Sequence, residues 1–409
     1  MMVYFSPRTN LEVKILFLLP TIILSIVMIG KRAKIDKFTL IGLLFFIVVV
    51  VTWSVYGVFR GNPGAIEFLR LFTIWPVLYY ILLLPINTIK LVKWFFDISA
   101  ISLFMISIYV LYIFGKEYGF PIFPPFEIDL GTAVGIHEGY SQITSHNIGM
   151  LSFLIPLFIS VIIHNDLILF KKSWIIKYLV FLSAIAAILS GRRVLLINIF
   201  LSPFLIGIIS KMVSPKLSQK TSKYISAYSI IFITVALLCA FLLASFTGWD
   251  IDNFSDRMSI FTEGGDDVRK DQGNSLIESF LESPLIGKGP GVGVGLLRSF
   301  ERSWSYELTY HLLLHNLGLV GFTLFFAPYV AIFNRVIKLT RSNYDHTLHK
   351  HDTLWPLHLL SGSIGMMIAS GSNPYLYSFD FFLAIFCLFI PINALNVGTT
   401  AANRTQSNY

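Results

Sequence analysis

Two adjacent arginines, Arg192 and Arg193, follow Ser190 and Gly191 between two long apolar stretches of the chain. Charged side chains are costly at such positions, and a planar guanidinium group matches a phosphate with two parallel hydrogen bonds. Either the pair snorkels toward lipid headgroups, or it binds the phosphate of a lipid-linked substrate. We favour phosphate binding.

Four further arginines occur in the polar stretch 248–306: Arg257, Arg269, Arg298 and Arg302. They alternate with acidic residues, so a solvated surface of weak ion pairs would explain any one of them. Because all four lie in one segment on the same predicted side of the molecule, we expect at least one of them to reach a substrate.

Glu307, His311 and His315 are spaced by four residues, so they form one stripe if a helix has begun by Ser305. The two histidines are eight residues apart, about 12 Å along a helix, so they cannot bind one metal ion together. Polar residues that line a helix interface are the alternative. We predict that Glu307 is a general base, that His311 contacts the substrate, and that no metal is bound.

The glycine-rich run 283–291 resembles a nucleotide-binding loop only superficially. It lacks the Gly-Lys-Ser/Thr ending and a preceding strand. We interpret it as a tight turn that returns the chain to the membrane, whose backbone amides could still hold an anion.

Two polar groups lie near predicted span ends. Asn373 follows a Ser-Gly-Ser run and precedes Pro374 and Tyr375, so it either caps a helix or contacts a sugar. Glu67 and Arg70 are three residues apart, and we predict a local ion pair between them.

The elements that must position these residues are membrane-spanning helices. Of the 409 residues, 55% are hydrophobic and 13% charged, and the mean hydropathy is +0.72, which excludes a soluble globular protein. We predict an all-α polytopic membrane protein with about 11 transmembrane helices (a range of about 10–12). The spans are expected near residues 11–30, 39–58, 66–84, 94–114, 146–163, 175–190, 194–210, 225–247, 307–333, 354–371 and 375–395. Residues 1–409 then form a single integral membrane domain in which 248–306 is one long extracytoplasmic loop, with an amphipathic helix near 275–281.

The net charge of +8 reflects topology, and we predict no nucleic-acid partner. Basic clusters fall at alternate ends of the predicted spans, and the positive-inside rule makes them cytoplasmic. These clusters lie at 31–37, 90–93, 171–177, 211–223 and 335–350. The opposite side then carries the arginines, the long loop and Asn373. Cys239 and Cys387 both lie in apolar runs, which supports neither a disulfide framework nor a cysteine metal site.

Four phrases, in order and with shared outer placement, carry a family resemblance over about residues 180–395. They are Ser190-Gly-Arg-Arg, Phe280-Leu-Glu-Ser-Pro-Leu-Ile-Gly-Lys-Gly-Pro-Gly, Tyr306-Glu-Leu-Thr-Tyr with Gly318-Leu-Val-Gly, and Asn373-Pro-Tyr. The set resembles the O-antigen polymerase (Wzy-type) and O-antigen ligase superfamily of bacterial membrane glycosyltransferases.

The resemblance implies roles for particular residues. Arg192 or Arg193, and one loop arginine such as Arg269, would engage the diphosphate of an undecaprenyl-linked donor, while Glu307 would activate the acceptor. Arg257, Arg298, Arg302, His311 and Asn373 would contribute to substrate binding. Ligases of the superfamily commonly have a histidine where this chain has Glu307, and polymerases often have glutamate there, which favours a polymerase.

The leading hypothesis is a polysaccharide polymerase of the bacterial cytoplasmic (inner) membrane, for O-antigen, capsule or exopolysaccharide, with its active site facing outside. Its donor and acceptor would be undecaprenyl-diphosphate-linked oligosaccharides, without a cofactor, nucleotide or metal. Membrane lipids are expected partners, and a chain-length regulator is a further candidate. An O-antigen ligase that acts on lipid A core or protein, and a secondary transporter, are the alternatives.

Overall fold

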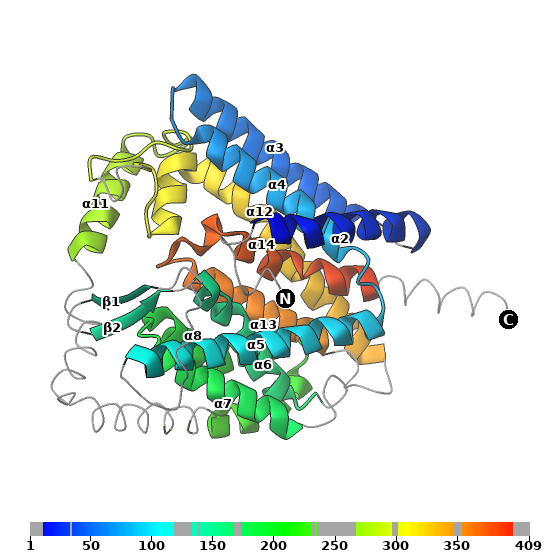
Figure 1. The fold of residues 1–409 in the computed structure, drawn as a ribbon. Coiled ribbons are helices and arrows are strands. Elements are labelled where there is room, and N and C mark those ends of the chain that lie inside the picture. Colours follow the sequence, from blue (N-terminus) through cyan, green and yellow to red (C-terminus); the bar gives the residue numbers. More distant parts are fainter. Residues whose placement is uncertain are drawn as a thin grey trace.

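The computed structural model describes residues 11–32, 35–117, 133–137, 140–144, 146–166, 173–228, 230, 234, 267–296, 302–346 and 354–395. These segments form a bundle of α-helices with one short antiparallel hairpin (Figure 1). The first half contains α2 (Leu11–Arg32), α3 (Lys37–Phe59), α4 (Ala65–Leu83), α5 (Ile89–Glu117), β1 (Ala133–His137), β2 (Tyr140–Thr144), the 3₁₀ helix η1 (His146–Met150), α6 (Leu151–His164) and α7 (Ser173–Leu189). The second half contains α8 (Arg193–Val213), α11 (Asp267–Leu281), α12 (Thr309–His346), α13 (Trp355–Ala369), the 3₁₀ helix η2 (Pro374–Tyr377) and α14 (Phe379–Phe386); residues 215–228 and 389–395 are helical as well.

Several long apolar helices agree with a multi-pass membrane protein. Within the described residues, five helices are long and apolar enough to cross a membrane: Lys37–Phe59, Ala65–Leu83, Ile89–Lys116, Arg193–Val213 and Thr309–Tyr344. Each coincides with a predicted span. Shorter apolar helices occupy four other predicted positions: Leu18–Ile29, Ile148–His164, Trp174–Leu189 and Phe381–Leu395.

The predicted count of 11 spans is not confirmed. The runs at 146–163 and 375–395 begin with the 3₁₀ helices η1 and η2, so the α-helical part of each is shorter than its apolar stretch. Most of the predicted span 225–247 lies outside the described residues. The β1–β2 hairpin is an addition to the predicted all-α class.

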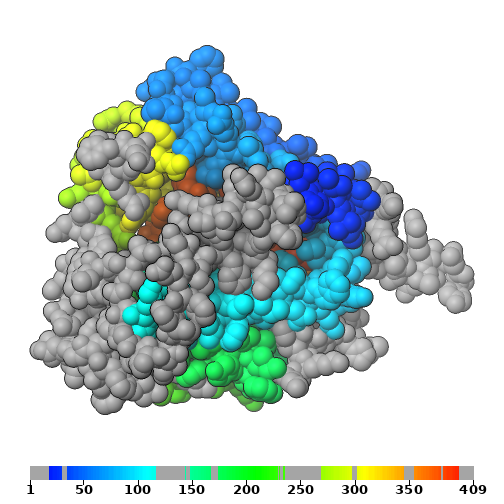
Figure 2. Space-filling model, viewed as in Figure 1, coloured from blue at the N-terminus to red at the C-terminus, as the bar shows by residue number. Residues whose placement is uncertain are grey.

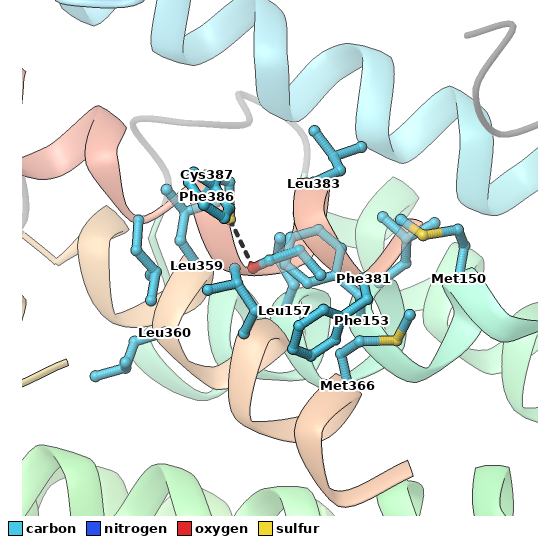
Figure 3. Packing of buried hydrophobic residues seen from close by; sticks show 14 of the residues in the cluster. Met150, Phe153, Leu157, Leu359, Leu360, Met366, Phe381, Leu383, Phe386 and Cys387 are labelled. Atoms are coloured by element: carbon cyan, nitrogen blue, oxygen red, sulfur yellow. Dashed lines mark hydrogen bonds between the residues drawn. The ribbon is translucent and has the colours of Figure 1, made fainter. Parts of the chain in front are cut away.

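The centre of the bundle is where α6, α13 and α14 pack together. Every residue of α6 is buried, which explains why this stretch is apolar on all sides. Figure 3 shows side chains of the three helices interlocking, among them Phe153, Met366 and Phe381. A Cβ atom at Gly362 would lie 2.8 Å from the Phe153 carbonyl oxygen, so glycine allows α13 to approach α6 closely.

Helix α12 is interrupted at Gly318, whose backbone has φ 64° and ψ −177°. This conformation is essentially restricted to glycine. The interruption frees carbonyl groups before it and N–H groups after it, all of which need hydrogen-bond partners inside an apolar protein.

The glycine-rich turn, residues 283–291, supplies those partners. The amides of Lys288 and Gly289 donate to the carbonyls of His315 and Asn316, both at 2.9 Å. In the opposite direction, the carbonyls of Pro284 and Leu285 accept from the amides of Leu319 at 2.8 Å and Val320 at 3.0 Å. The Leu317 carbonyl accepts from Trp53 Nε1 on α3 at 2.9 Å. The predicted turn is therefore confirmed, and it is inserted into the break of α12.

The α3–α4 hairpin holds the outer side of the same turn. Asn62 Nδ2 donates to the carbonyls of Lys288 at 3.1 Å and Pro290 at 3.2 Å, and the Gly64 amide donates to the Gly291 carbonyl at 3.0 Å. Figure 2 shows this blue hairpin directly against the yellow residues that follow α11. The long predicted loop 248–306 is thus, in its described part, a helix and a packed turn.

Segments predicted for one side of the membrane lie together. Figure 1 shows α11 and the β1–β2 hairpin at the same end of the bundle, and the Ile143 amide donates to the Ser190 carbonyl at 3.1 Å. At the other end, Arg341 Nε donates to the Val213 carbonyl at 3.2 Å. These contacts are compatible with the predicted alternation of the segments along the chain.

Gly318→Ala tests the interrupted helix. A Cβ atom there would lie 2.4 Å from the Gly287 nitrogen and from the Leu285 carbonyl oxygen, so we expect the free energy of unfolding to fall by about 2 to 6 kcal/mol from strain and overpacking. Thermal unfolding of the purified protein, followed by tryptophan fluorescence, measures this. Gly42→Ala is the control, because a Cβ atom at Gly42 in α3 meets nothing within 4 Å; equal melting temperatures of the two variants would contradict the analysis.

Candidate functional site

An ion pair joins Arg269 of α11 to Glu307, which lies just before α12. Arg269 Nε donates to Glu307 Oε2 at 2.5 Å, and the side chains are 34% and 19% exposed. Both residues were predicted to be catalytic, and the structure brings them together. Helix α12 begins at Thr309, so Glu307 is not part of a helical stripe with His311 and His315, as the sequence spacing had suggested.

A small apolar cluster places α11 against the start of α12. It contains Leu276 from α11 together with Tyr306 and Leu312, all buried. A Cβ atom at Gly273 would lie 3.3 Å from Leu308, so the helix surfaces are close at this point. This packing explains why Arg269, one turn earlier on α11, reaches Glu307.

Arg192 and Arg193 lie at the start of α8. Gly191, with φ 68°, turns the chain at this corner, and Arg192 is the N-cap residue of the helix. The Arg192 guanidinium donates to the Ile143 carbonyl of β2 at 3.5 Å and to the Tyr375 hydroxyl at 3.4 Å. Arg193 is the first residue of α8 and is half-buried.

The turn around Asn373 connects these two parts. The Thr309 hydroxyl at the start of α12 donates to the Asn373 carbonyl at 3.0 Å, and Tyr375, two residues later, contacts Arg192. Asn373 is the N-cap residue of η2, although its side chain makes no capping hydrogen bond. One short turn therefore links the surroundings of Glu307 to Arg192.

A cavity of about 110 Å³ opens beside the segment that leads into α12. It is lined by residues of α4, the glycine-rich turn, the segment before α12, α12 itself and η2: Gly64, Glu67, Phe68, Leu71, Gly291, Arg302, Trp304, Ser305, Tyr306, Leu312, Asn316, Pro374 and Tyr377.

Glu67 pairs with Arg302 at 3.3 Å, so the predicted local pair with Arg70 is wrong. The loop residue is preferred because packing of α4 against the glycine-rich turn brings it within reach.

Tyr306 closes one wall of this cavity. Its hydroxyl accepts from the Val294 amide at 2.8 Å and donates to the Val294 carbonyl at 3.3 Å. Burial raises the pKa of Tyr306 above its ordinary value. The phenol therefore stays protonated near neutral pH, as its role as a donor requires.

Two amides of the glycine-rich turn are not available to an anion. Those of Lys288 and Gly289 are used by α12, so the prediction that they could hold an anion is wrong for these two groups. Lys288 Nζ donates to Glu282 Oε2 at 2.6 Å, and this hydrogen bond lowers the pKa of Glu282.

Other predicted residues lie near the site or outside the described chain. His311 lies in the first turn of α12, and its Nδ1 atom is buried without a hydrogen-bond partner among the described residues. His315 is buried at the level of the helix break. Arg257 and Arg298 fall outside the described residues.

Sequence reasoning missed two groups of residues. Trp304, Asn316 and Tyr377 line the cavity, but single aromatic and amide residues carry no distinctive spacing. At the opposite end of the bundle, two histidines join α6, α8 and α13 through buried hydrogen bonds: Ser160 with His358 at 2.9 Å, His358 with Asp166 at 3.1 Å and His164 with Ser210 at 3.0 Å. The only available signal for this buried network was the occurrence of histidine and aspartate at the ends of apolar runs.

A double-mutant cycle tests whether the Arg269–Glu307 contact is a coupled pair. With Arg269→Gln and Glu307→Gln, we expect a coupling free energy of about 1 kcal/mol, because the pair is partly shielded from water. The Glu67–Arg302 pair is the matched comparison; at 3.3 Å and with side chains 48% and 58% exposed, it should give less than about 0.5 kcal/mol. Thermal unfolding of the single and double variants provides both values. Strict additivity at Arg269 and Glu307 would show that they do not act as a pair.

No protein-family model matches this chain, and no curated protein matches it either.

Proposed function

We propose that this chain is a polysaccharide polymerase of the bacterial cytoplasmic membrane. It would transfer a growing glycan from undecaprenyl diphosphate onto a lipid-linked repeat unit. The observation that carries the proposal is the half-buried contact between Arg269 and Glu307. This contact supports the proposal because it joins the predicted base to a predicted phosphate ligand, and both residues fall within the region, about residues 180–395, over which the chain resembles the polymerase and ligase superfamily.

In the proposed reaction, an acceptor hydroxyl oxygen attacks the anomeric carbon of the donor sugar. The new glycosidic bond forms while the bond from that carbon to the diphosphate oxygen breaks. Glu307 accepts the hydroxyl proton, and undecaprenyl diphosphate leaves with the electron pair. Arg269 holds the Glu307 carboxylate in one orientation through its Nε hydrogen bond.

The leaving diphosphate requires positive charge. Arg192 is suited to this role because it lies at the N-terminus of α8, where the helix dipole adds to its own charge. Its hydrogen bonds to Ile143 and Tyr375 are long, 3.5 and 3.4 Å, so a phosphate oxygen could replace either partner at modest cost. Guanidinium groups would then neutralise the charge of the leaving group.

Orientation supports an outer active site. The basic segments at 90–93, 171–177, 211–223 and 335–350 alternate with the site-bearing segments along the chain, so the positive-inside rule predicts that the arginines and Glu307 face outside. Undecaprenyl chains would lie in the bilayer beside the apolar helices. A chain-length regulator is the protein partner expected of such an enzyme.

The interrupted helix α12 is a feature that transporters also use, and there the freed carbonyls coordinate ions. Here the carbonyls of residues 315–317 accept hydrogen bonds from Lys288, Gly289 and Trp53. Because protein donors already bind these carbonyls, the break in α12 favours an enzyme over a transporter. A ligase remains the alternative within the enzyme class.

Deletion of the gene in its source bacterium tests the reaction class. We expect the surface glycan ladder to collapse to a single repeat unit and lipid-linked single units to accumulate, because units would still be made but not joined. Gel electrophoresis of surface glycans and mass spectrometry of undecaprenyl-linked saccharides measure this. Loss of glycan from its acceptor with lipid-linked polymer still present would select the ligase, and an unchanged ladder would refute both.

Glu307→Gln and Arg192→Ala test the proposed roles in that deletion strain. Each variant should reduce polymer formation by about 100-fold or more, as removal of a general base or of a charge-stabilising group does. Glu282→Gln and Arg60→Ala are matched controls, since both side chains are exposed near the same end and lie outside the proposed chemistry. Normal ladders from well-expressed Glu307→Gln and Arg192→Ala proteins would rule out this mechanism.

A further inference from the structure

The cavity next to the start of α12 is lined by two residues whose buried polar atoms the described protein leaves unsatisfied. Asn316 is 2% exposed, and its Oδ1 atom has no hydrogen-bond partner among the described residues. The Tyr377 hydroxyl lies close to the Asn316 amide, but no hydrogen bond of normal geometry joins them, and that hydroxyl is likewise without a partner in the described part of the chain. Buried polar groups are normally satisfied, so a ligand is the natural partner for these two.

Aromatic rings form part of the cavity wall. Phe68, Trp304, Tyr306 and Tyr377 all line the cavity, and Tyr377 is fixed by edge-on packing against Phe72 at 5.4 Å between ring centroids. Rings of this kind offer apolar faces to the C–H groups of a sugar. Pyranose rings combine such faces with hydroxyl groups, and they therefore match a cavity that is both aromatic and polar.

The rim carries one charge of each sign. The carboxylate of Glu67 and the guanidinium of Arg302 are 3.3 Å apart and about half-exposed. A carboxylate accepts hydrogen bonds from neighbouring hydroxyls, and a guanidinium donates them. Because the charges compensate each other, the rim favours a neutral polyol over an anion.

The size of the cavity limits the ligand to one ring. Its volume is about 110 Å³, whereas an enclosed cavity of about 150 Å³ accommodates benzene. The rim residues are partly exposed, so a pyranose ring can enter with one edge outside. A disaccharide would extend beyond the walls.

Chain connectivity brings such a ring close in sequence to the proposed base. Ser305 and Tyr306 line the cavity, and Glu307 follows them directly. Pro374 and Tyr377 on the opposite wall belong to the turn that Thr309 binds through Asn373. A sugar in the cavity would therefore contact the residues directly before the proposed base in the chain, although Glu307 does not itself line the cavity.

We propose that this cavity binds one neutral pyranose residue, the terminal sugar of the acceptor glycan, and thereby selects the acceptor; this assignment rests on the proposed function. Asn316 and Tyr377 bind its hydroxyls inside the cavity, the aromatic walls contact its ring, and Glu67 and Arg302 bind hydroxyls at the rim.

Binding of simple sugars to Tyr377→Phe tests this site. The probes are the methyl pyranosides of glucose, galactose, mannose, rhamnose and N-acetylglucosamine, added to the full-length protein in a detergent without a sugar headgroup. Saturation-transfer NMR titrations provide the dissociation constants. We expect at least one methyl pyranoside to bind, and Tyr377→Phe and Asn316→Leu each to weaken it about 3- to 10-fold through one lost hydrogen bond. Tyr56→Phe is the control, since the Tyr56 hydroxyl contacts Arg60 instead of the cavity.

Thermal unfolding separates lost binding from a damaged fold. The Tyr377 hydroxyl is buried and unsatisfied, so its removal should leave the melting temperature unchanged or raise it. A lower melting temperature of Tyr377→Phe would show that the hydroxyl has a structural partner and would overturn the assignment. Absence of binding by every probe, or equal binding by the wild type and both cavity variants, would also overturn it.

Sugar 1-phosphates distinguish the acceptor from the donor sugar. If they bind more tightly than methyl pyranosides and lose affinity in Tyr377→Phe, the cavity holds the donor sugar and the acceptor assignment is wrong. These binding measurements need no turnover. A normal ladder in Glu307→Gln would thus refute the proposed reaction without affecting the result for the cavity, and absent binding would refute the cavity without affecting the reaction.

Discussion

The hydrogen bonds that close the break in α12 determine how this end of the molecule is assembled. In an apolar helix, freed backbone groups have no water to bind, so each must be satisfied by protein. The glycine-rich turn satisfies both sides of Gly318 with main-chain groups, and Trp53 adds one side-chain donor. These bonds join α3, the turn and α12 into one unit, from which the neighbouring segments are positioned.

The positions of the chemically important groups follow from this unit. The chain enters the turn from α11 and leaves it toward Tyr306 and Glu307, so both partners of the Arg269–Glu307 pair are attached to it. The α3–α4 hairpin, bound through Asn62 and Gly64, brings Glu67 to the cavity. The η2 turn is bound to the start of α12 and extends the same arrangement to Arg192.

The sequence predicts more of this fold than of the site. Apolar runs locate the helices because burial and lipid contact both require them, and five predicted spans coincide with described helices that are long and apolar enough to cross a membrane. Arg192 and Glu307 were singled out because charge is costly beside apolar helices, and Arg269 as an arginine of the polar stretch 248–306; their catalytic roles stay predictions. Helix ends were less predictable: spacing alone could not show that α12 starts after Glu307, or that Glu67 prefers Arg302 to Arg70. Contacts between residues far apart in sequence create the cavity, and no local pattern records them.

The glycine-rich turn contacts α12 mainly through its main chain. The geometry of this contact therefore depends little on which side chains the turn carries. Gly287, Gly289 and Gly291 have positive φ angles, and a Cβ atom at each would lie 2.5, 2.8 and 2.1 Å, respectively, from a neighbouring atom. In contrast, Leu285 is 63% exposed and Ile286 is 49% exposed. Substitutions at these outward-facing residues would therefore leave the main-chain contact between the turn and α12 unchanged. Chains built on this plan could meet different lipids or protein partners at that surface while the position of the carboxylate and guanidinium groups stays the same.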